Sequence, residues 1–281
     1  MRTIGADSAP LSPRGDFVAS LAAGLRVLAA FTSERPELGV GELARMLEMD
    51  KRRTQRLVST LFDLGYLDQD PVSRRYRPGV AVLTLGYAAL HSLDLRQLAR
   101  PHLSALLEQF GQTVNLGVRH RRDVVFVECL RGERFRLGVN VHVGDRLPIH
   151  LSSLGKALLC RLPDKECAEV IDAIRFEALT PNSVRSSDAL RDQLARARGR
   201  GYAVMDQETT LGVRSVAAPV LTRDGYPVAA VNVAMPTPLI SMAEMEETVA
   251  PSVVLAAGRM SGLLAADGDC RPEMSLPGAG S

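Results

Sequence analysis

The segment ELARMLEMDKRRTQRLVSTLFDLGYL, residues 42–67, decides the fold of the N-terminal part of the chain. Its apolar residues recur at helical spacing and predict a short helix, a turn at Met49 and Asp50, and a second helix that begins at Lys51. Asp50 is the expected N-cap, because its carboxylate can accept hydrogen bonds from the free N–H groups of the first turn. Gly65 is expected to end the second helix, since glycine readily adopts the left-handed conformation required there.

The first two turns of the second predicted helix are strongly basic. Six residues there hold four cations, Lys51, Arg52, Arg53 and Arg56. The positive end of the helix dipole disfavours cations, so we expect this charge to face an anionic partner. In a helix-turn-helix, the start of the second helix faces the major groove and the flanking phosphates of DNA. A solvated basic helix face is the alternative when this segment is taken alone.

Two flanking segments favour the DNA interpretation. Upstream, apolar residues at helical spacing predict a first helix over residues 17–31. Downstream, a strand is predicted to start at residue 66, to turn at residues 68–71 and to return at residues 74–77, which hold three arginines. Three helices followed by a basic two-stranded wing define a winged helix-turn-helix, and such wings commonly contact phosphates or the minor groove.

The composition limits the class of protein. The 281 residues are 46% hydrophobic and 23% charged, which suits a globular protein with two domains. The net charge is only +2, so any nucleic-acid surface must be local. The four cysteines show neither a C-x-x-C pair nor a histidine at ligand spacing, so we expect no disulfide framework, zinc site or other cofactor. We also expect no apolar run of membrane-spanning length and no signal peptide, hence a cytoplasmic protein without membrane contact.

The remaining chain predicts a helical connector and then an α+β domain. Residues 80–110 are leucine-rich and helical, with an interruption near residues 91–92, and His91 and His102 on them are interpreted as ordinary surface or contact residues. From residue 112 the apolar period falls to two and predicts an antiparallel sheet with flanking helices. The predicted strands cover residues 114–118, 124–128, 135–141, 201–205, 215–221 and 228–234. The predicted helices cover residues 154–162, 164–174, 187–199 and 242–264.

Residues 119–122, Arg-His-Arg-Arg, lie at the tip of the first predicted hairpin of this domain. Such a cluster can form a second anion site, or it can be a solvated turn. We favour the solvated turn because the cluster belongs to a polar loop.

A second informative segment is PIHLSSLGKA, residues 148–157. It offers two serines at the start of a predicted helix, and a helix N-terminus is a ready site for a carboxylate or phosphate. The same serines also fit an ordinary helix cap. Polar residues on the later strands add weight to a ligand pocket, because an asparagine within an apolar strand needs a partner. These residues are Asp206, Ser215 and Asn232.

The chain resembles the IclR family of transcriptional regulators over residues 17–264. Four segments carry the resemblance: SLAAGLRVLAAF (20–31), GELARMLEMDKRRTQRLVSTLFDLGYL (41–67), GDRLPIHLSSLGKALL (144–159) and GYAVMDQETTLGVRSVAAPVLTRDGYPVAAVNVAMP (201–236). The resemblance implies a winged helix-turn-helix, a C-terminal effector-binding domain of GAF-like α/β fold, and homodimers or homotetramers on palindromic double-stranded operator DNA. The expected boundaries are a disordered leader (1–15), the DNA-binding domain (16–79), a helical linker (80–110), the effector-binding domain (111–265) and a disordered tail (266–281).

The resemblance also implies functional residues. The predicted DNA contacts are Lys51, Arg52, Arg53, Thr54, Gln55, Arg56, Arg74 and Arg75. The predicted effector pocket consists of Ser152, Ser153, Leu154, Asp206, Ser215, Asn232 and Ala234. Arg53 departs from the smaller residue or threonine that the family usually has, and Asn232 and Ala234 replace two common hydroxyls. The amide and methyl groups suggest an effector larger or more apolar than a two-carbon acid.

The segment that starts at Asp50, the pair Gln55 and Arg56, and residues 206–216 resemble the subgroup of the family that controls aromatic-acid catabolism. Protocatechuate and 4-hydroxybenzoate are among the effectors of that subgroup. The favoured hypothesis is therefore a regulator that senses a small organic acid, most plainly an aromatic one, and controls adjacent catabolic genes.

Two other hypotheses compete with a ligand-responsive regulator. The first is an enzyme that acts on a small organic acid in the C-terminal domain, with His150, Asp206, Ser215 and Cys129 as candidates. These residues form no recognisable nucleophile elbow, metal triad or phosphate loop. The second is a scaffold that uses the winged domain for protein contacts. We favour the regulator, because a polar pocket without a paired acid and base is typical of a sensor.

Overall fold

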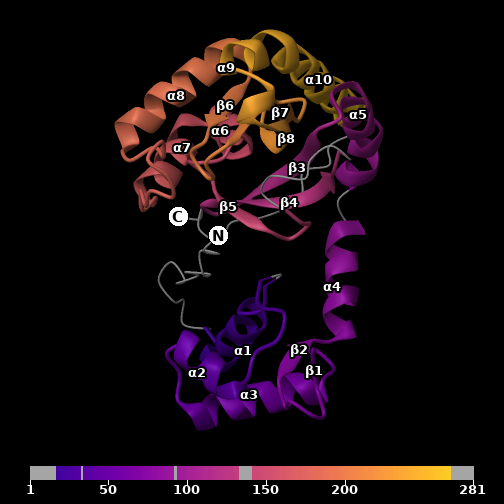
Figure 1. The fold of residues 1–281 in the computed structure, drawn as a ribbon, viewed down its shortest axis with the longest axis vertical. Coiled ribbons are helices and arrows are strands. Elements are labelled where there is room, and N and C mark those ends of the chain that lie inside the picture. Colours follow the sequence, from indigo (N-terminus) through magenta and orange to yellow (C-terminus); the bar gives the residue numbers. More distant parts are fainter. Residues whose placement is uncertain (1–16, 33, 92–93, 133–140, 267–281) are drawn as a thin grey trace. The chain divides into compact units, whose positions relative to one another are not determined.

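The computed structural model describes residues 17–32, 34–91, 94–132 and 141–266. The chain forms two compact units, Met1–Ser92 and Leu93–Ser281, both shown in Figure 1. The boundary between them falls within the expected connector, because one helix ends at His91 and the next begins at Asp94.

The first unit has the predicted winged helix-turn-helix fold. Its elements are α1 (Ala19–Ala29), α2 (Val40–Met46), α3 (Lys51–Asp63), β1 (Leu67–Gln69), β2 (Tyr76–Pro78) and α4 (Val80–His91). The core is one apolar cluster in which Val27, Leu43, Val58 and Leu67 are fully buried. Strands β1 and β2 pair antiparallel, and two backbone hydrogen bonds of 2.9 Å join Leu38 to Tyr76. The wing is therefore attached to the segment that leads into α2.

The turn between α2 and α3 follows the sequence prediction. The Asp50 carboxylate accepts hydrogen bonds from the backbone N–H groups of Arg52 at 2.8 Å and Arg53 at 3.0 Å. Gly65 follows the end of α3 with a φ of 74°, a left-handed conformation that glycine adopts without steric cost. The predicted cap and the predicted helix end are both confirmed.

The second unit contains one antiparallel six-stranded sheet, in the order β5-β4-β3-β8-β7-β6. Its strands are β3 (Thr113–His120), β4 (Asp123–Leu130), β5 (Arg146–Pro148), β6 (Ala203–Asp206), β7 (Val213–Leu221) and β8 (Pro227–Pro236). The predicted α+β class is confirmed. Strand β5 was not predicted, because three residues are too short to show a period of two. The strand predicted over residues 135–141 lies, apart from its last residue, outside the described residues.

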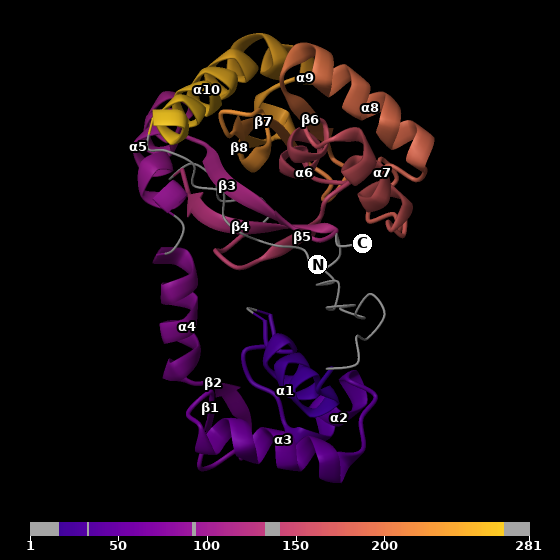
Figure 2. The same ribbon diagram turned by 180° about the vertical axis from the view of Figure 1, so that it is seen from behind.

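Helices cover both faces of this sheet. They are α5 (Asp94–Phe110), α6 (Ser153–Leu159), α7 (Asp164–Asp172), α8 (Ser187–Arg200), α9 (Met242–Glu244) and α10 (Ala250–Ala266). Figures 1 and 2 show α5 and α10 side by side on one face, where the Gln109 amide donates to the Ser252 hydroxyl at 3.1 Å. Helix α6 packs on the opposite face, against β7 and β8. One face of the sheet is therefore covered by α5 and α10, and the other by α6.

The terminal helical stretch corrects one expectation from the sequence. The 24 residues Met242–Ala265 are long and apolar enough, by length and composition, to cross a membrane. One side of this stretch is nevertheless buried in the second unit, at Met245, Val249, Val253 and Met260. Since α10 packs on β7, the apolar residues are explained by the core of a globular unit.

Helix α6 is buried along its whole length, including the charged Lys156. Gly155 permits this packing, because a Cβ atom at that position would lie 2.0 Å from the carbonyl oxygen of Ile149. That distance is far inside van der Waals contact, and the contact is with backbone, which cannot rotate away. The turn before α6 can fold back onto the helix only if residue 155 is glycine.

We expect Gly155→Ala to lower the free energy of unfolding of the second unit by about 3 kcal/mol, the upper range for overpacking. Gly199→Ala in α8 is the control, since a Cβ there meets nothing within 4 Å. It should stabilise the helix by about 0.5 kcal/mol. Urea unfolding followed by circular dichroism measures both changes, and equal stability of the two variants would contradict the close approach.

Candidate DNA interface and effector site

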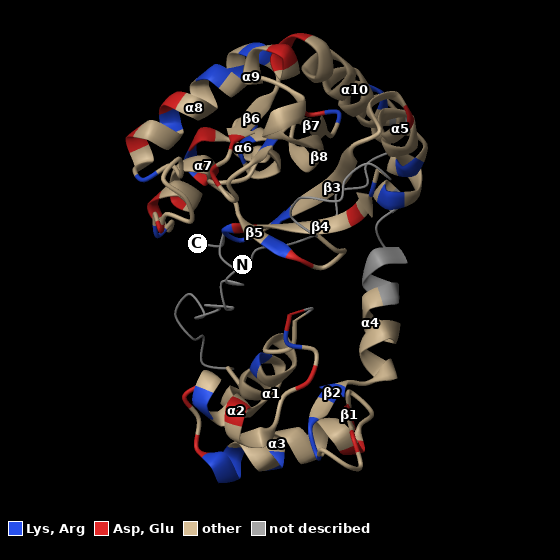
Figure 3. Ribbon diagram, in the orientation of Figure 1, with Lys and Arg blue, Asp and Glu red and all other residues tan. Residues whose placement is uncertain are grey.

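The start of α3 presents unpaired positive charge. Lys51, Arg52, Arg53 and Arg56 are exposed. In Figure 3, one end of α3 has the blue colour of Lys and Arg. Within the described residues, none of these four side chains forms an ion pair. The first turn contains no acidic residue, and the helix N–H groups are satisfied instead by the adjacent Asp50 cap. This arrangement leaves the cations available to an external anion.

Thr54 does not belong to that exposed surface. Its side chain is fully buried, and its hydroxyl donates to the carbonyl oxygen of Asp50 at 2.9 Å. Thr54 and Val58 are four residues apart and share the core face of α3. The predicted DNA contact of Thr54 is therefore wrong. Gln55 is exposed, and its amide donates to the Ser59 hydroxyl at 3.3 Å.

The arginines of the wing have different surroundings. Arg74 is exposed and has a φ of 57° at the turn. Arg75 instead forms an ion pair with Glu42 at 2.8 Å and donates to the carbonyl oxygen of Glu37 at 3.0 Å. Arg75 thus braces the wing against the start of α2, and its predicted DNA contact stays a prediction. Arg77 in β2 is exposed and was not predicted, although it alternates with the buried Tyr76, as the period of a strand requires.

The Glu42 carboxylate has a structural function at the same place. It accepts a hydrogen bond from the Gly39 backbone N–H at 2.7 Å and so caps α2. This bond and then the Arg75 guanidinium hold the pKa of Glu42 below its ordinary value. The acid of this pair is therefore ionised at neutral pH and keeps Arg75 in place.

In the second unit, the structure brings together several predicted effector residues. The hydroxyl oxygens of Ser153 and Ser215 lie 2.7 Å apart, and the Asn232 amide donates to Ser153 at 3.4 Å. Ala234 is paired with Ser215 across β7 and β8, so both side chains are on the α6 face. Leu154, the residue after Ser153 on α6, is fully buried. The result is a buried polar cluster between a helix start and two central strands.

Two residues of β3 extend this cluster and were not predicted. The Asn115 amide Nδ2 donates to the side-chain oxygen Oδ1 of Asn232 at 2.9 Å, and Thr113 is paired with Ala234. Thr113 Oγ1 and Asn115 Oδ1 are buried, and no described residue hydrogen-bonds to either atom. The signal was present in the sequence, because these residues occupy alternate positions of an otherwise apolar strand. We denote Thr113, Asn115, Ser153, Ser215 and Asn232 the polar cluster.

Asp206 does not belong to the polar cluster. Its carboxylate accepts hydrogen bonds from Arg214 at 2.7 Å and from the Gln207 amide at 3.2 Å. The register pairs Asp206 with Arg214, whereas Ser215 is paired with Met205. Because alternate residues of a strand point to opposite faces, Asp206 and Ser215 lie on opposite sides of the sheet. The predicted effector contact of Asp206 is therefore wrong.

Ser152 occupies the N-cap position of α6 and is buried, but its side chain makes no capping hydrogen bond. The Ser152 hydroxyl therefore does not form the expected capping hydrogen bond. Ser153, one residue later, supplies the hydroxyl that reaches the sheet. The helix itself has only seven residues.

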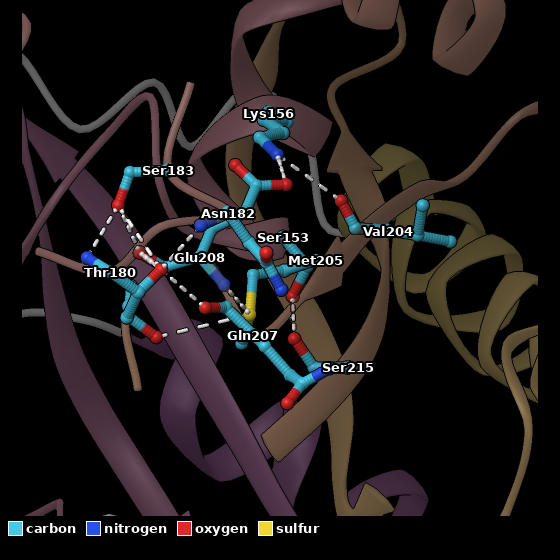
Figure 4. Close-up of polar contacts among 11 residues, drawn as sticks. Ser153, Lys156, Thr180, Asn182, Ser183, Val204, Met205, Gln207, Glu208 and Ser215 are labelled. Atoms are coloured by element: carbon cyan, nitrogen blue, oxygen red, sulfur yellow. Dashed lines mark hydrogen bonds and ion pairs between the residues drawn. The ribbon is translucent and has the colours of Figure 1, made fainter. Parts of the chain in front are cut away.

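A buried ion pair lies next to the polar cluster. The Lys156 ammonium is 2.5 Å from Glu208 and donates to the Val204 carbonyl oxygen at 3.4 Å, as Figure 4 shows. Only 1% of the Lys156 side chain and 7% of that of Glu208 are exposed. Burial lowers the pKa of Lys156 and raises the pKa of Glu208, whereas their mutual attraction opposes both changes. Nothing in the helical pattern of residues 153–159 distinguished this lysine from an exposed one.

The arginine-rich hairpin tip is only partly a solvated turn. Arg119 and His120 belong to β3, and the turn consists of Arg121 and Arg122. Arg119 is 13% exposed and forms an ion pair with Glu166. Its guanidinium also donates to the hydroxyl of Tyr226 at 3.3 Å. Arg119 therefore joins the hairpin to α7, which excludes it from the turn expected at this position.

The candidate catalytic groups are not activated. Burial and then the charge of Lys156 lower the pKa of His150 to about 4, and its ring packs edge-to-face on Phe176 with centroids 5.2 Å apart. Burial raises the pKa of the Cys129 thiol to about 12. A neutral buried imidazole and a protonated thiol do not form a nucleophile and base pair.

Comparison with known families follows the two units. Residues 20–71 match the IclR helix-turn-helix domain, and residues 87–261 match the bacterial transcriptional regulator IclR C-terminal domain. The chain therefore belongs to the IclR family and is a DNA-binding transcriptional regulator of that type. The family consists of regulators, so the enzyme hypothesis is not supported.

Individual relatives agree with this assignment. The HTH-type transcriptional regulator XynR of Escherichia coli (strain K12) is 30% identical over 228 residues, which cover 81% of this chain and 90% of that protein. The Pca regulon regulatory protein of Pseudomonas putida is 30% identical over 244 residues, covering 87% and 83%. The crystal structure of an IclR homolog from Microbacterium hydrocarbonoxydans complexed with 4-hydroxybenzoate has a TM-score of 0.76. It is 24% identical and covers 88% of this chain and 100% of that one, a similarity of fold.

We expect Asp50→Ala to lower the free energy of unfolding by about 1 kcal/mol, because it removes the acceptor that caps α3. Asp50→Asn is the matched control, since asparagine caps equally well without the negative charge. Urea unfolding of the two variants separates the causes. Equal losses of stability would show that the charge of Asp50, rather than its hydrogen bonds, stabilises the helix.

Proposed function

We propose that the chain binds operator DNA with the basic start of α3 and responds to a small organic acid, an aromatic one, held at the polar cluster. The observation that carries this proposal is the group of four exposed, unpaired cations on α3. The acid would control genes adjacent to that of the regulator, in the cytoplasm, where its operator lies. It would act by binding two arrangements of the protein with different affinity.

The proposed DNA surface consists of α3 and the tip of the wing. The exposed residues that would contact bases or phosphates are Lys51, Arg52, Arg53, Gln55, Arg56 and Arg74. Arg77 is exposed on the same wing and joins this set. Thr54 and Arg75 are left out, because burial and an internal ion pair occupy their side chains. Phosphate contacts by the cations would supply most of the affinity.

We propose that the chain acts as a homodimer, or as a tetramer of two dimers. Helix α1 supports this, because 64% of Leu21 and 58% of Leu25 are exposed, and Phe17 and Val18 beside them are exposed as well. An apolar stripe of this kind on a surface helix suits a protein contact. A second copy also matches the twofold symmetry of a palindromic operator.

The aromatic-acid proposal rests on the polar cluster and on two relatives. The relatives are the Pca regulon regulator and the homolog complexed with 4-hydroxybenzoate. In this chain, Ser153 and Ser215 offer hydroxyls to a carboxylate, and Ala234 and Leu154 offer apolar contact. Thr113 Oγ1 and Asn115 Oδ1 are without a hydrogen-bond partner among the described residues, a costly state for buried groups. A hydroxyl group on the acid would satisfy one or both atoms.

We expect Arg52→Ala to reduce the salt dependence of operator affinity by roughly one unit of the logarithmic slope, because one phosphate contact is lost. Arg196→Ala is the control, since Arg196 is an exposed cation of the second unit. Fluorescence anisotropy with DNA from upstream of the gene, over a series of salt concentrations, measures the slope. A separate measurement of the mass of the protein–DNA complex, by light scattering, gives the number of protein copies bound. An unchanged slope for Arg52→Ala would contradict the placement of α3, and absence of any binding would favour a protein scaffold.

We expect 4-hydroxybenzoate to raise the melting temperature more than benzoate does, because only the former carries a hydroxyl for Thr113 or Asn115. A ligand at a hundred times its Kd stabilises the native state by about 2.7 kcal/mol. Thr113→Val should reduce the difference between the two acids, whereas Thr248→Val at an exposed site should preserve it. Failure of every aromatic acid to shift the wild-type protein would refute the aromatic assignment.

A further inference from the structure

We propose that Lys156 and Glu208 are a positioning pair for the effector site. The proposal rests on the function assigned above to the polar cluster, and it concerns how that cluster is held. The pair would fix α6 relative to β6 and β7, so that the Ser153 hydroxyl stays opposite Ser215. Neither side chain needs to touch the ligand.

Helix α6 depends on tertiary contacts for its position. It has seven residues, too few for a helix to be stable in isolation. All seven are buried, and six of them are apolar or small, so most contacts of α6 are non-directional. Such contacts hold the helix against the sheet but tolerate small shifts along it. Polar bonds with defined geometry must therefore fix its position.

Within the described residues, three polar side-chain contacts join α6 to the β6–β7 hairpin, and one of them is the bond from Lys156 to the Val204 carbonyl oxygen at 3.4 Å. The other two are the contact between Ser153 and Ser215 at 2.7 Å and the ion pair between Lys156 and Glu208 at 2.5 Å. An effector that binds the serine hydroxyls competes with the contact between Ser153 and Ser215. The ion pair lies one turn further along the helix and is not part of the polar cluster. When ligand is bound, it remains to hold α6 in place.

Glu208 is itself held firmly, as Figure 4 shows. The Thr180 hydroxyl donates to the Gln207 carbonyl oxygen at 2.7 Å, and the Ser183 hydroxyl donates to that of Glu208 at 2.7 Å. The loop between β6 and β7 is thus attached to the segment before α8. A carboxylate on a braced loop gives Lys156 a fixed point, which a mobile surface acid would not.

Burial of this ion pair carries a desolvation cost, so stability alone does not explain why the pair is there. Two charges lose their hydration in the interior, and well-packed apolar residues often give equal or greater stability. The two nearby arginines, Arg196 and Arg200, add repulsion at Lys156. Apolar residues cannot, however, replace the directional bond that fixes the position of α6. Apolar replacements should therefore restore stability without restoring the position of the helix, and this difference can be measured.

The experiment compares wild type, Lys156→Met, Glu208→Gln and the double variant Lys156→Met/Glu208→Leu. Each single variant leaves one charge buried without its partner and should lower the melting temperature. The double variant should regain most of that loss. Its affinity for 4-hydroxybenzoate, measured by calorimetry, should nevertheless remain weaker by about tenfold or more. Glu246→Gln, which removes the charge from a partly exposed ion pair with Arg200, should retain wild-type affinity.

Hydrogen exchange of the ligand-free proteins gives a second measurement. Peptides from residues 153–159 should exchange faster in the double variant than in wild type, whereas peptides from α8 should not. A double variant with wild-type affinity and wild-type exchange of α6 would overturn the proposal and leave a purely structural pair. If wild type does not bind 4-hydroxybenzoate, the aromatic-acid assignment fails separately, and the exchange of α6 then decides the positioning function.

Discussion

The close approach of Gly155 to the Ile149 carbonyl oxygen is the constraint on which the polar interior of the second unit depends. Because residue 155 has no side chain, the turn before α6 folds back onto the helix, and α6 is buried along its length. Only then do Ser153 and Lys156, three residues apart on one helix, both reach the β6–β7 hairpin. Both the polar cluster and the buried ion pair thus depend on the absence of a side chain at residue 155.

In the first unit, the constraint is electrostatic. Several cations lie at the N-terminus of α3, where the positive end of the helix dipole disfavours them. Asp50 satisfies the N–H groups of the first turn of α3 from outside the helix, so no acidic side chain is needed within it. Glu42 forms an ion pair with Arg75, so this arginine differs from the wing and α3 cations that have no internal ion pair among the described residues. The unit therefore separates arginines that hold the wing from arginines that can meet phosphates. A count of basic residues in the sequence cannot make that separation.

The sequence predicted the positions of helices and strands better than it predicted which side chains of an element face the core. Helical spacing and the turn residues located α3, its cap and its end, because these depend on neighbours in the chain. Asp206 was misplaced because one residue of register moves a side chain to the opposite face of a sheet. Thr54 was misplaced in the same manner on a helix, where position relative to the core decides exposure. Arg75 and Lys156 find partners 33 and 52 residues away, and no local pattern encodes such pairs.

The two units use polar groups in opposite ways, and the difference follows from the size of the partner. A polyanion such as DNA is met at a surface, where cations can remain hydrated until binding releases counterions, so exposed and unpaired side chains suffice. A small acid must be enclosed to be recognised, and enclosed polar groups are costly unless each has a partner. The polar cluster bonds to itself across α6, β7, β8 and β3, and two of its atoms, Thr113 Oγ1 and Asn115 Oδ1, have no hydrogen-bond partner among the described residues. If an acid binds there, as we propose, its recognition would depend on these two atoms and on how rigidly α6 holds its side of the cluster.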